Sequence, residues 1–325
     1  MLELSGANIL ITGGAGFIGS HLADSLLRLG CKVTVLDNFD DFYSGKEENV
    51  KHNLGNSKYR LIKADIRDQA AVDSACKGID VIFHLAAQAG IRYCNLDPVK
   101  TNSVNVDGTI NVLNSARKHG VKKLVYASSS SVFGKIVKVP IDENHPTNPT
   151  SVYGASKLSA EKYCLAYFES YGLQVTCLRY FSVYGPRGRP DQVIHAFVKN
   201  ILGGQSPIIY GDGSHSRDFT FVSDVVSATI LSAMREESSG RVFNIGYGKE
   251  YRIIDVAEMI LDALNSNKPP AFKEGYQGDF PRTLCNNRKA QELLGWKAQV
   301  PLREGISYFI EWYKLNRREV YQKVN

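Results

Sequence analysis

The stretch Thr12-Gly13-Gly14-Ala15-Gly16-Phe17-Ile18-Gly19 decides the fold of this chain. It follows an apolar segment, Asn8–Thr12, that is typical of a buried strand, and it leads into an amphipathic segment, Ile18–Leu29, that is typical of a helix. Its glycines have no Cβ, so the backbone can approach a pyrophosphate, and the start of the helix faces that negative charge. A glycine run alone is also compatible with a tight strand–helix turn. Its position in the first β-α unit favours cofactor binding.

The same alternation of short apolar runs and longer amphipathic stretches continues through the first half. Strands are expected at Asn8–Thr12, Lys32–Leu36, Tyr59–Lys63, Val81–Leu85, Leu124–Ala127 and Val175–Arg179. Helices are expected at Ile18–Leu29, Gln69–Ala75, Asn105–His119 and Ala155–Tyr171. This pattern predicts an α/β fold with a doubly wound parallel sheet of the Rossmann type, covered by helices on both faces.

After Tyr180 the pattern becomes irregular, with Gly and Pro clustered at 184–190 and 203–213. Further helices are expected at Asp224–Met234, Ile254–Asn265, Arg288–Leu294 and Leu302–Leu315. We therefore predict a dinucleotide-binding domain over residues 1–180 and a smaller α/β cap, mainly for the substrate, over residues 181–325, with the chain crossing between them. In open α/β sheets, ligands bind at the carboxyl ends of the strands.

Composition excludes several classes of protein. The 325 residues are 43% hydrophobic and 22% charged, as in ordinary globular proteins. No apolar run approaches the roughly 18 residues of a membrane span, and the N-terminus shows no signal peptide. Six scattered cysteines without CxxC spacing argue against a metal site or a disulfide framework and favour the cytoplasm. The net charge of +6 is not concentrated in a basic run, so a small anionic substrate is favoured over nucleic acid.

Acidic and small residues follow the next strands. Asp37-Asn38 ends the second strand at about the spacing of a ribose-binding acid. A carboxylate there accepts hydrogen bonds from a 2′-hydroxyl and repels a 2′-phosphate, so NAD is favoured over NADP. Asp65-Ile66 could frame the adenine, and Leu85-Ala86-Ala87-Gln88 leaves room for the cofactor. His84 is interpreted as a packed or capping residue.

Tyr153 and Lys157 are the candidate acid–base pair. Positions i and i+4 share one face of a helix, so the phenol and the ammonium point the same way. A free tyrosine has a pKa of about 10 and is a poor base at neutral pH. A lysine cation, together with the positive nicotinamide of NAD, is expected to lower that pKa. Ser128–Ser131 ends the fifth strand, where hydroxyl groups indicate substrate contact.

The motifs Thr12–Gly19, Ser128–Gly134, Tyr153–Lys157 and Leu178–Pro186 together resemble those of extended short-chain dehydrogenases/reductases, in the nucleotide-sugar epimerase branch. The resemblance covers nearly the whole chain. It implies that Tyr153 is the base, Lys157 its partner, and Ser129 the hydroxyl that binds the reacting oxygen. Cofactor contacts are expected from Gly13, Gly16, Phe17, Ile18, Gly19, Asp37, Asn38, Asp65, Ile66, Leu85, Ala86, Ala87, Gln88, Asn105, Tyr153, Lys157 and Tyr180.

Two further stretches concern the sugar. Similar dehydratases and decarboxylases carry a carboxylate after the catalytic hydroxyl residue, whereas this chain has Ser130 and Ser131, which favours epimerisation. Ser182 and Arg189 resemble UDP-glucuronate 4-epimerases, and the resemblance implies that Arg189 meets the C6 carboxylate of the sugar. Alternatively, Arg189 is a solvated loop residue or binds only diphosphate.

Residues at the nucleotide end are also carried over from the resemblance. Tyr210 would stack on uracil, Arg217 would clamp the diphosphate, and Asp279 would close the pocket. Tyr276 stands where several relatives have an arginine, so Arg92 and Arg282 are its candidate substitutes. The expected substrate contacts are Arg92, Ser129, Ser130, Tyr153, Ser182, Arg189, Tyr210, Arg217 and Asp279.

The predicted function is therefore NAD-dependent 4-epimerisation of a UDP-sugar, with UDP-glucuronate to UDP-galacturonate favoured. UDP-glucose/UDP-galactose or UDP-N-acetylglucosamine 4-epimerisation is the alternative within the class. A non-catalytic NAD-binding sensor is the alternative from another class. The resemblance also implies a homodimer formed through the helices Asn105–His119 and Ala155–Tyr171.

Overall fold

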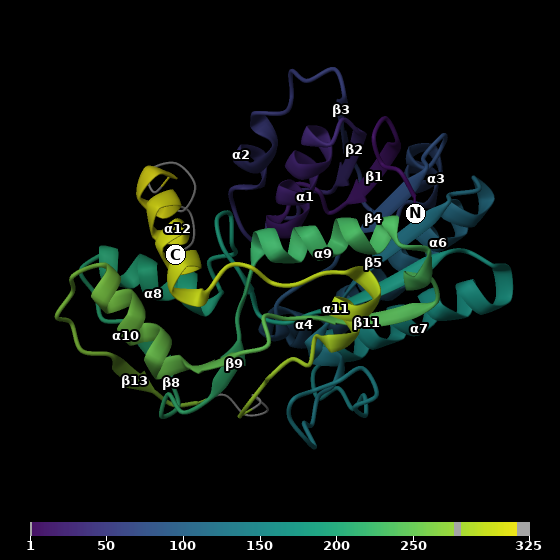
Figure 1. Cartoon of the computed structure of the whole chain (residues 1–325). Coiled ribbons are helices and arrows are strands. Elements are labelled where there is room, and N and C mark those ends of the chain that lie inside the picture. Colours follow the sequence, from purple (N-terminus) through teal and green to yellow (C-terminus); the bar gives the residue numbers. More distant parts are fainter. Residues whose placement is uncertain (1, 276–280, 317–325) are drawn as a thin grey trace.

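A seven-stranded, fully parallel sheet forms the centre of the computed structural model, which describes residues 2–275 and 281–316 (Figure 1). The strand order is β3-β2-β1-β4-β5-β6-β11. The strands are β1 (Asn8–Thr12), β2 (Lys32–Asp37), β3 (Tyr59–Lys63), β4 (Val81–His84), β5 (Lys123–Ser129), β6 (Val175–Tyr180) and β11 (Arg241–Ile245). The predicted α/β class and doubly wound sheet are confirmed, and six of these strands were expected.

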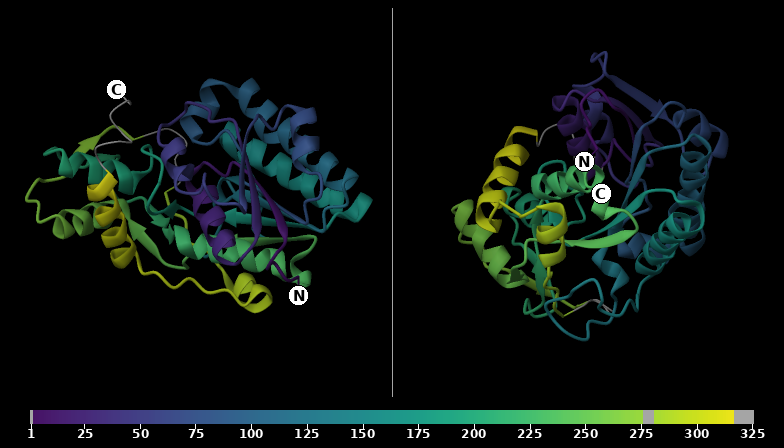
Figure 2. Two further views of the ribbon diagram at one scale, coloured as in Figure 1. Left: turned by 90° about the horizontal axis from the view of Figure 1, so that it is seen from above. Right: turned by 45° about the vertical axis from the view of Figure 1, so that its right-hand side comes forward.

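Helices cover both faces of this sheet. One face carries α1 (Phe17–Arg28), α9 (Val222–Met234) and α11 (Arg288–Leu294); the other carries α3 (Gln69–Ala75), α6 (Gly108–Lys118) and α7 (Val152–Tyr171). In the left view of Figure 2, the blue and teal helices lie on one side of the sheet and the green helix α9 on the other. No helix in the described part of the chain combines the length and apolar character needed to cross a membrane.

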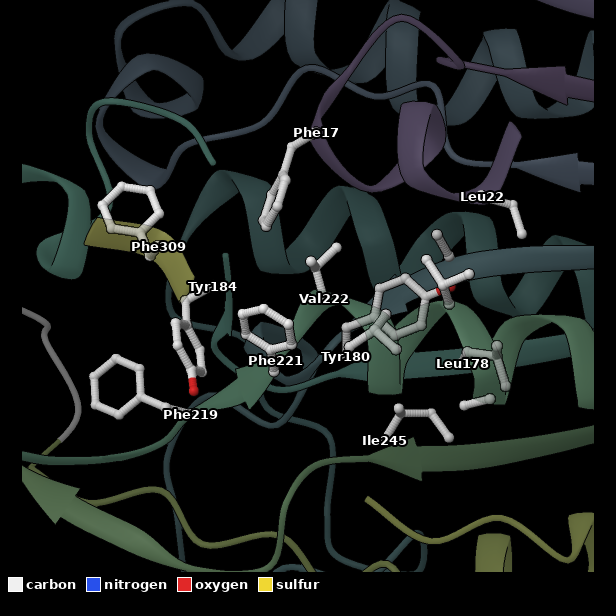
Figure 3. Packing of buried hydrophobic residues seen from close by; sticks show 14 of the residues in the cluster. Phe17, Leu22, Leu178, Tyr180, Tyr184, Phe219, Phe221, Val222, Ile245 and Phe309 are labelled. Atoms are coloured by element: carbon white, nitrogen blue, oxygen red, sulfur yellow. The ribbon is translucent and has the colours of Figure 1, made fainter. Parts of the chain in front are cut away.

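The larger hydrophobic core lies between the sheet, α1 and α9. Figure 3 shows Phe17 of α1, Val222 of α9 and Leu178 of β6 directed into the same cluster. Each buried side chain of this kind stabilises the fold by about 1.5–3 kcal/mol. Because α9 and β11 come from the second half of the sequence, both halves of the chain build one core.

A second group of elements lies beside the sheet and contains α8, α10 and α12 (Figures 1 and 2). The helices are α8 (Val193–Leu202), α10 (Ile253–Ala263) and α12 (Leu302–Asn316). Three strand pairs accompany them: parallel β7 (Val183–Tyr184) with β10 (Thr220–Phe221), antiparallel β9 (Ser216–Asp218) with β12 (Glu250–Arg252), and parallel β8 (Ile208–Tyr210) with β13 (Ala271–Lys273). The aromatic residues Tyr184, Phe221 and Phe309 continue the main cluster toward this group.

The structure differs from the sequence prediction in several elements. Helix α7 begins at Val152 and not at Ala155, because the Ser151 hydroxyl accepts a hydrogen bond from the Gly154 N–H (3.0 Å) and caps the helix. The expected helix from Asn105 is a π-helical turn, Ser103–Asp107, that continues into α6. Strand β11, helix α8 and the short helices α2 (Lys46–Lys51), α4 (Ile91–Leu96) and α5 (Pro98–Asn102) were not expected.

His84, at the end of β4, links three elements of the sheet region. Its Nδ1 lies 2.6 Å from Thr12 Oγ1 of β1, and its Nε2 lies 2.9 Å from Thr109 Oγ1 of α6. Complete burial, together with the charge of Lys157, lowers the pKa of His84 to about 3. The imidazole is therefore neutral in the folded protein and packed, as the sequence suggested.

This neutral histidine predicts a loss of stability in acid. Between pH 6.5 and pH 3 the unfolded chain binds a proton at His84 that the folded protein does not, so folding is fully supported above pH 6.5 and weakened as the pH falls. From pH 7 to pH 5 this residue should cost about 2 kcal/mol of unfolding free energy. Urea denaturation at pH 7 and at pH 5 measures this difference in the free energy of unfolding. The variant His84→Gln should show a correspondingly smaller pH dependence, and an equal dependence would contradict the assignment.

Candidate active site

A cavity that is open to solvent on one side lies at the carboxyl ends of the central strands and holds about 1110 Å³ of space, the open part included. It opens where the strand order reverses between β1 and β4, which is the usual ligand position in sheets of this type. Its lining consists of Gly13, Gly16, Phe17, Ile18, Gly19, Leu36, Asp37, Asn38, Asp40, Phe42, Tyr43, Lys46, Ala64, Ile66, Leu85, Ala86, Ala87, Gln88, Ala89, Val104, Ala127, Ser128, Tyr153, Lys157, Tyr180 and Arg189. Most of the cofactor residues expected from the sequence, and two expected substrate residues, Tyr153 and Arg189, therefore meet in one place.

The glycine turn leaves the backbone bare at the floor of this cavity. Gly13 has φ +72°, and a Cβ there would lie 2.7 Å from the backbone nitrogen of Ala86. A Cβ at Gly19 would lie 2.3 Å from the Gly13 carbonyl oxygen. Gly16, the N-cap residue of α1, has no side chain to bond the helix start, and the Phe17 N–H there donates to the Tyr43 hydroxyl at 3.2 Å. This cradle fits the pyrophosphate of a dinucleotide.

Asp37 lies at the end of β2, where a ribose-binding acid was expected. One of its oxygens accepts from the Ala15 N–H (3.0 Å) and the other from the Phe39 N–H (2.9 Å). Burial raises the pKa of Asp37, while these two hydrogen bonds and the Lys46 ammonium act against the rise. The two N–H groups fix the carboxylate, and each oxygen retains a lone pair for a ribose hydroxyl. The residues present therefore fit NAD.

Three expected cofactor residues have other partners. Asn38 lines the cavity, and its Nδ2 donates to Asp65 Oδ2 at 2.9 Å. Asp65 does not line the cavity and forms an ion pair with Arg67. Asn105, in the π-helical turn, holds Gln88: its Oδ1 accepts from the Gln88 N–H (2.7 Å), and its Nδ2 donates to the Gln88 carbonyl (3.1 Å). Asn105 thus shapes the cavity wall from behind.

Tyr153, Lys157 and Ser129 meet at the other end of the cavity. Ser129 ends β5, opposite Tyr180 of β6, and its side chain is hydrogen-bonded to that of Tyr153. Burial lowers the pKa of Lys157 to about 8, and its Nζ lies 4.2 Å from the ring centre of Tyr126. These residues come from β5 and the first turns of α7.

The charge that acts on Tyr153 differs from the expected one. Loss of hydration raises the pKa of Tyr153, and the strongest effect in the opposite direction is the charge of Arg189, followed by the hydrogen bond to Ser129. The sequence pointed to Lys157 as the cation that lowers this pKa. In the structure, burial outweighs the charges, and Arg189, from the loop after β7, is the main stabilising cation.

A buried ion pair fixes the catalytic helix behind these residues. Arg179 of β6 donates to both carboxylate oxygens of Glu161 in α7, at 2.7 and 3.0 Å, and the Ser128 hydroxyl donates to the same carboxylate at 2.7 Å. The two charged side chains are only 4% and 0% exposed. Glu161 lies one helical turn beyond Lys157, and Ser128 directly precedes Ser129. The ion pair and its serine contact therefore fix the position of α7 relative to β5.

Breaking this pair should destabilise the protein strongly. Glu161→Met or Arg179→Met leaves a buried charge without its partner, which costs about 3–5 kcal/mol. The double variant Glu161→Met/Arg179→Met removes both charges and should lose much less than the sum of the two single changes. Chemical denaturation of the four proteins measures the coupling. Additive losses would show that the two side chains act independently.

The remaining expected substrate residues lie outside the cavity lining. Ser130 starts the turn after Ser129, and Ser182 lies between β6 and β7. The Arg92 guanidinium lies 5.3 Å from the ring centre of Tyr210, across the space between α4 and β8. Two further arginines have protein partners: Arg217 donates to the Ser216 carbonyl, and Arg282 forms an ion pair with Glu250. Asp279 and Tyr276 lie outside the described residues.

Sequence reasoning missed the segment after β2. Phe42, Tyr43 and Lys46 line the cavity, and the Tyr43 hydroxyl accepts a hydrogen bond from the Phe17 N–H at the start of α1 (3.2 Å). The sequence feature that could have indicated this segment is Gly45-Lys46, a glycine followed by a cation. In the structure Gly45 has φ +97° and directly precedes α2. A helix of six residues is too short for its periodicity to be recognised.

Comparison with known proteins agrees with this geometry. The model of the NAD-dependent epimerase/dehydratase family matches residues 9–246. The chain belongs to this family. The predicted family, the NAD cofactor and an enzyme of the epimerase type are thereby confirmed.

Similar proteins in this family are named for different sugars. A putative UDP-glucose 4-epimerase of Methanocaldococcus jannaschii is 38% identical over 95% of this chain and 99% of its own. The structure of a UDP-N-acetylglucosamine 4-epimerase from Methanobrevibacter ruminantium, 34% identical, superposes with a TM-score of 0.90 over 96% of this chain and 99% of its own. That of a UDP-glucuronic acid 4-epimerase from Bacillus cereus, with UDP-glucuronic acid and NAD, is 31% identical with a TM-score of 0.90 over 95% and 99%.

Proposed function

We propose that this enzyme interconverts UDP-glucuronate and UDP-galacturonate by inverting C4 of the sugar. The observation that carries the proposal is the position of Arg189, which lines the same cavity as Tyr153 and Lys157 and is the main cation acting on Tyr153. Of its side chain 22% is exposed, so it is not a solvated loop residue. A guanidinium beside the catalytic base suits a sugar that carries a carboxylate next to the reacting carbon.

The residues at the cavity end fit reversible chemistry at C4. Tyr153, as phenolate, removes the proton of the C4 hydroxyl and later returns it, while the Ser129 hydroxyl holds the same oxygen. NAD, when bound, supplies the hydride acceptor at C4 and the hydride donor in the reverse direction. Lys157, with a pKa near 8, is largely protonated at neutral pH, and Arg189 is the cation that acts most strongly on the Tyr153 phenol. Return of the hydride to the other face of the rotated 4-keto sugar inverts C4, so the cofactor is regenerated.

A uronate substrate makes one further demand on this site. A ketone at C4 and a carboxylate on C5 form a β-keto acid, which can lose CO₂ when the C–C bond aligns with the carbonyl π system. The site must hold the carboxylate away from that alignment. Arg189 with the neighbouring serine hydroxyls is the proposed restraint, and the absence of a carboxylate after Ser129 agrees with a reaction that retains C6.

The alternatives use the same scaffold. A UDP-glucose or UDP-N-acetylglucosamine 4-epimerase would need Tyr153, Lys157 and Ser129 but no cation at the position of Arg189. A non-catalytic NAD sensor would need the glycine turn and Asp37 but no catalytic triad. In this scheme residues 1–180 hold mainly the cofactor and residues 181–325 mainly the nucleotide sugar, and a cytoplasmic location remains a prediction.

Substrate preference tests the proposal directly. Purified protein with NAD should convert UDP-glucuronate to UDP-galacturonate, and should act more slowly on UDP-glucose and UDP-N-acetylglucosamine. Chromatography of the products identifies each sugar. Conversion of UDP-glucuronate mainly to a pentose, or a clear preference for a neutral sugar, would overturn the proposal.

Tyr153→Phe should lower turnover by a factor of about 10²–10⁴, as expected for the loss of a general base. Unchanged biological activity of that variant would favour the non-catalytic NAD sensor.

We also propose that the enzyme is a homodimer. A shallow groove runs along the outer side of α7 and is lined by Pro149, Ala155, Leu158, Ser159, Lys162, Tyr163 and Ala166. Tyr163 and Tyr171 on the same helix are 43% and 52% exposed, which is high for large aromatic side chains. Sedimentation equilibrium should give twice the chain mass of 36.0 kDa. Tyr163→Glu should shift the protein toward monomer, and a monomeric wild type would contradict the proposal.

A further inference from the structure

The strongest unassigned feature of the cavity is the carboxylate that already contacts Arg189. Asp191 pairs with it in a bidentate arrangement: Arg189 Nε donates to one Asp191 oxygen at 2.9 Å, and Nη2 donates to the other at 3.1 Å. We propose that Asp191 is a positioning residue that determines substrate specificity. It holds the guanidinium by one edge and presents the opposite edge to the carboxylate of the substrate. The inference rests on the proposed uronate substrate.

The argument begins with the donors of the guanidinium. Arginine has five N–H groups arranged in two forks, one formed by Nε with one Nη and the other by the two Nη atoms. Asp191 occupies the first fork. Within the described residues, no hydrogen bond of Arg189 uses Nη1, and Nη2 has a second N–H beyond the one that Asp191 accepts, so the fork formed by Nη1 and Nη2 can still donate twice. A second carboxylate can therefore bind in bidentate fashion while the first stays in place.

The surroundings restrict the pair to this orientation. Pro190 separates the two residues and fixes the backbone between them, and the Gln192 N–H donates to the Arg189 carbonyl at 3.1 Å. The Arg189 guanidinium lies 5.9 Å from the ring centre of Phe42. The geometry thus depends on a short, braced loop rather than on a long flexible one.

The absence of a side chain at Gly90 leaves room for the carboxylate of Asp191. The φ of this glycine is +91°, and a Cβ there would lie 3.0 Å from Phe42 Cζ and 3.6 Å from Asp191 Oδ2. The carboxylate of Asp191 therefore packs close to bare backbone in the segment before α4. A side chain at residue 90 would therefore press on both Phe42 and the Asp191 carboxylate.

The pairing with Asp191 explains how Arg189 can favour a carboxylate over a diphosphate and also fix the orientation of that carboxylate. With Asp191 in place the Arg189/Asp191 pair is neutral overall, so its guanidinium attracts a diphosphate less than a free cation would. The free fork matches a planar carboxylate with two hydrogen bonds, whereas a neutral hydroxymethyl group can satisfy only one donor. Two-point binding also fixes the plane of the carboxylate, which is the restraint that a β-keto acid requires. Asp191 thus favours uronates over neutral sugars without contacting the sugar.

The test compares three changes at this pair in the full-length, NAD-loaded enzyme. Asp191→Asn keeps the size of the side chain and removes its charge, and Asp191→Glu keeps the charge. Arg189→Ala removes the guanidinium that would bind the sugar carboxylate. Asp262→Asn, at an exposed acid in α10, is the matched control. For each protein, kcat and KM are measured with UDP-glucuronate and with UDP-glucose, the Kd of UDP alone by calorimetry, and any pentose product by chromatography.

We expect Asp191→Asn to lower the ratio of kcat/KM for UDP-glucuronate over UDP-glucose by about tenfold, mainly through a higher KM for the uronate. Pentose should increase, and the Kd of UDP should stay within about twofold, since the nucleotide does not use this pair. Arg189→Ala should lower the same ratio at least as much. Asp191→Glu should retain part of the wild-type ratio, and Asp262→Asn should match the wild type.

The possible failures are distinguishable. If the wild type prefers UDP-glucuronate but Asp191→Asn retains the same ratio, the role of Asp191 is wrong while the proposed function stands. If Asp191→Asn slows both sugars equally or weakens UDP binding in parallel, the residue is merely structural, and the inference is again overturned. If the wild type does not epimerise UDP-glucuronate, the proposed function fails first, and the inference fails with it.

Discussion

The ion pair between Glu161 and Arg179 is the contact on which the catalytic end of this enzyme depends. It joins α7 to β6, and through the Ser128 hydroxyl it also joins α7 to β5. Tyr153, Lys157 and Ser129 all lie within eight residues of Glu161 or Ser128, so these buried contacts help to fix their mutual geometry. Charge burial on this scale is tolerated only because every partner is in place. The chemistry is therefore built on a rigid corner of the sheet.

Positive charge in the cavity is distributed and balanced rather than concentrated. Lys46 lies toward the cofactor end, Lys157 below the base, and Arg189 on the substrate side. Each has a counterpart: Asp37 acts on Lys46, the Tyr126 ring lies under Lys157, and Asp191 pairs with Arg189. A cavity with charges arranged in this way can bind a dinucleotide at one end and an anionic sugar at the other. No single strong positive potential extends over the whole cavity that the described residues form, so the two anionic ligands do not compete for the same cations.

The sequence predicted the sheet and the cofactor end well, because both depend on local patterns. The glycine turn, Asp37 and the Tyr153/Lys157 spacing are short motifs whose backbone consequences are fixed by neighbouring residues. The seventh strand, helix α8 and the cavity residues Phe42 and Tyr43 were not found. Their positions depend on contacts between distant segments, and a short apolar run such as Arg241–Ile245 carries no signal for where it pairs. The pairing of Arg189 with Asp191 was missed for a related reason: the R-P-D sequence indicated a cation, but only the folded loop shows its partner.

The crossing of the chain between its two groups has a consequence for how binding and folding are connected. A chain that ended at Tyr180 would lack α9, and the apolar side chains of β1, β2 and β5 on that face would be exposed to water. The cofactor-binding part of the sheet therefore depends on α9 for the packing of this face, and loosening α9 would weaken the core beneath the glycine turn. Occupancy of either ligand subsite then raises the cost of unfolding for both, so cofactor retention and sugar recognition are thermodynamically linked through one shared interior.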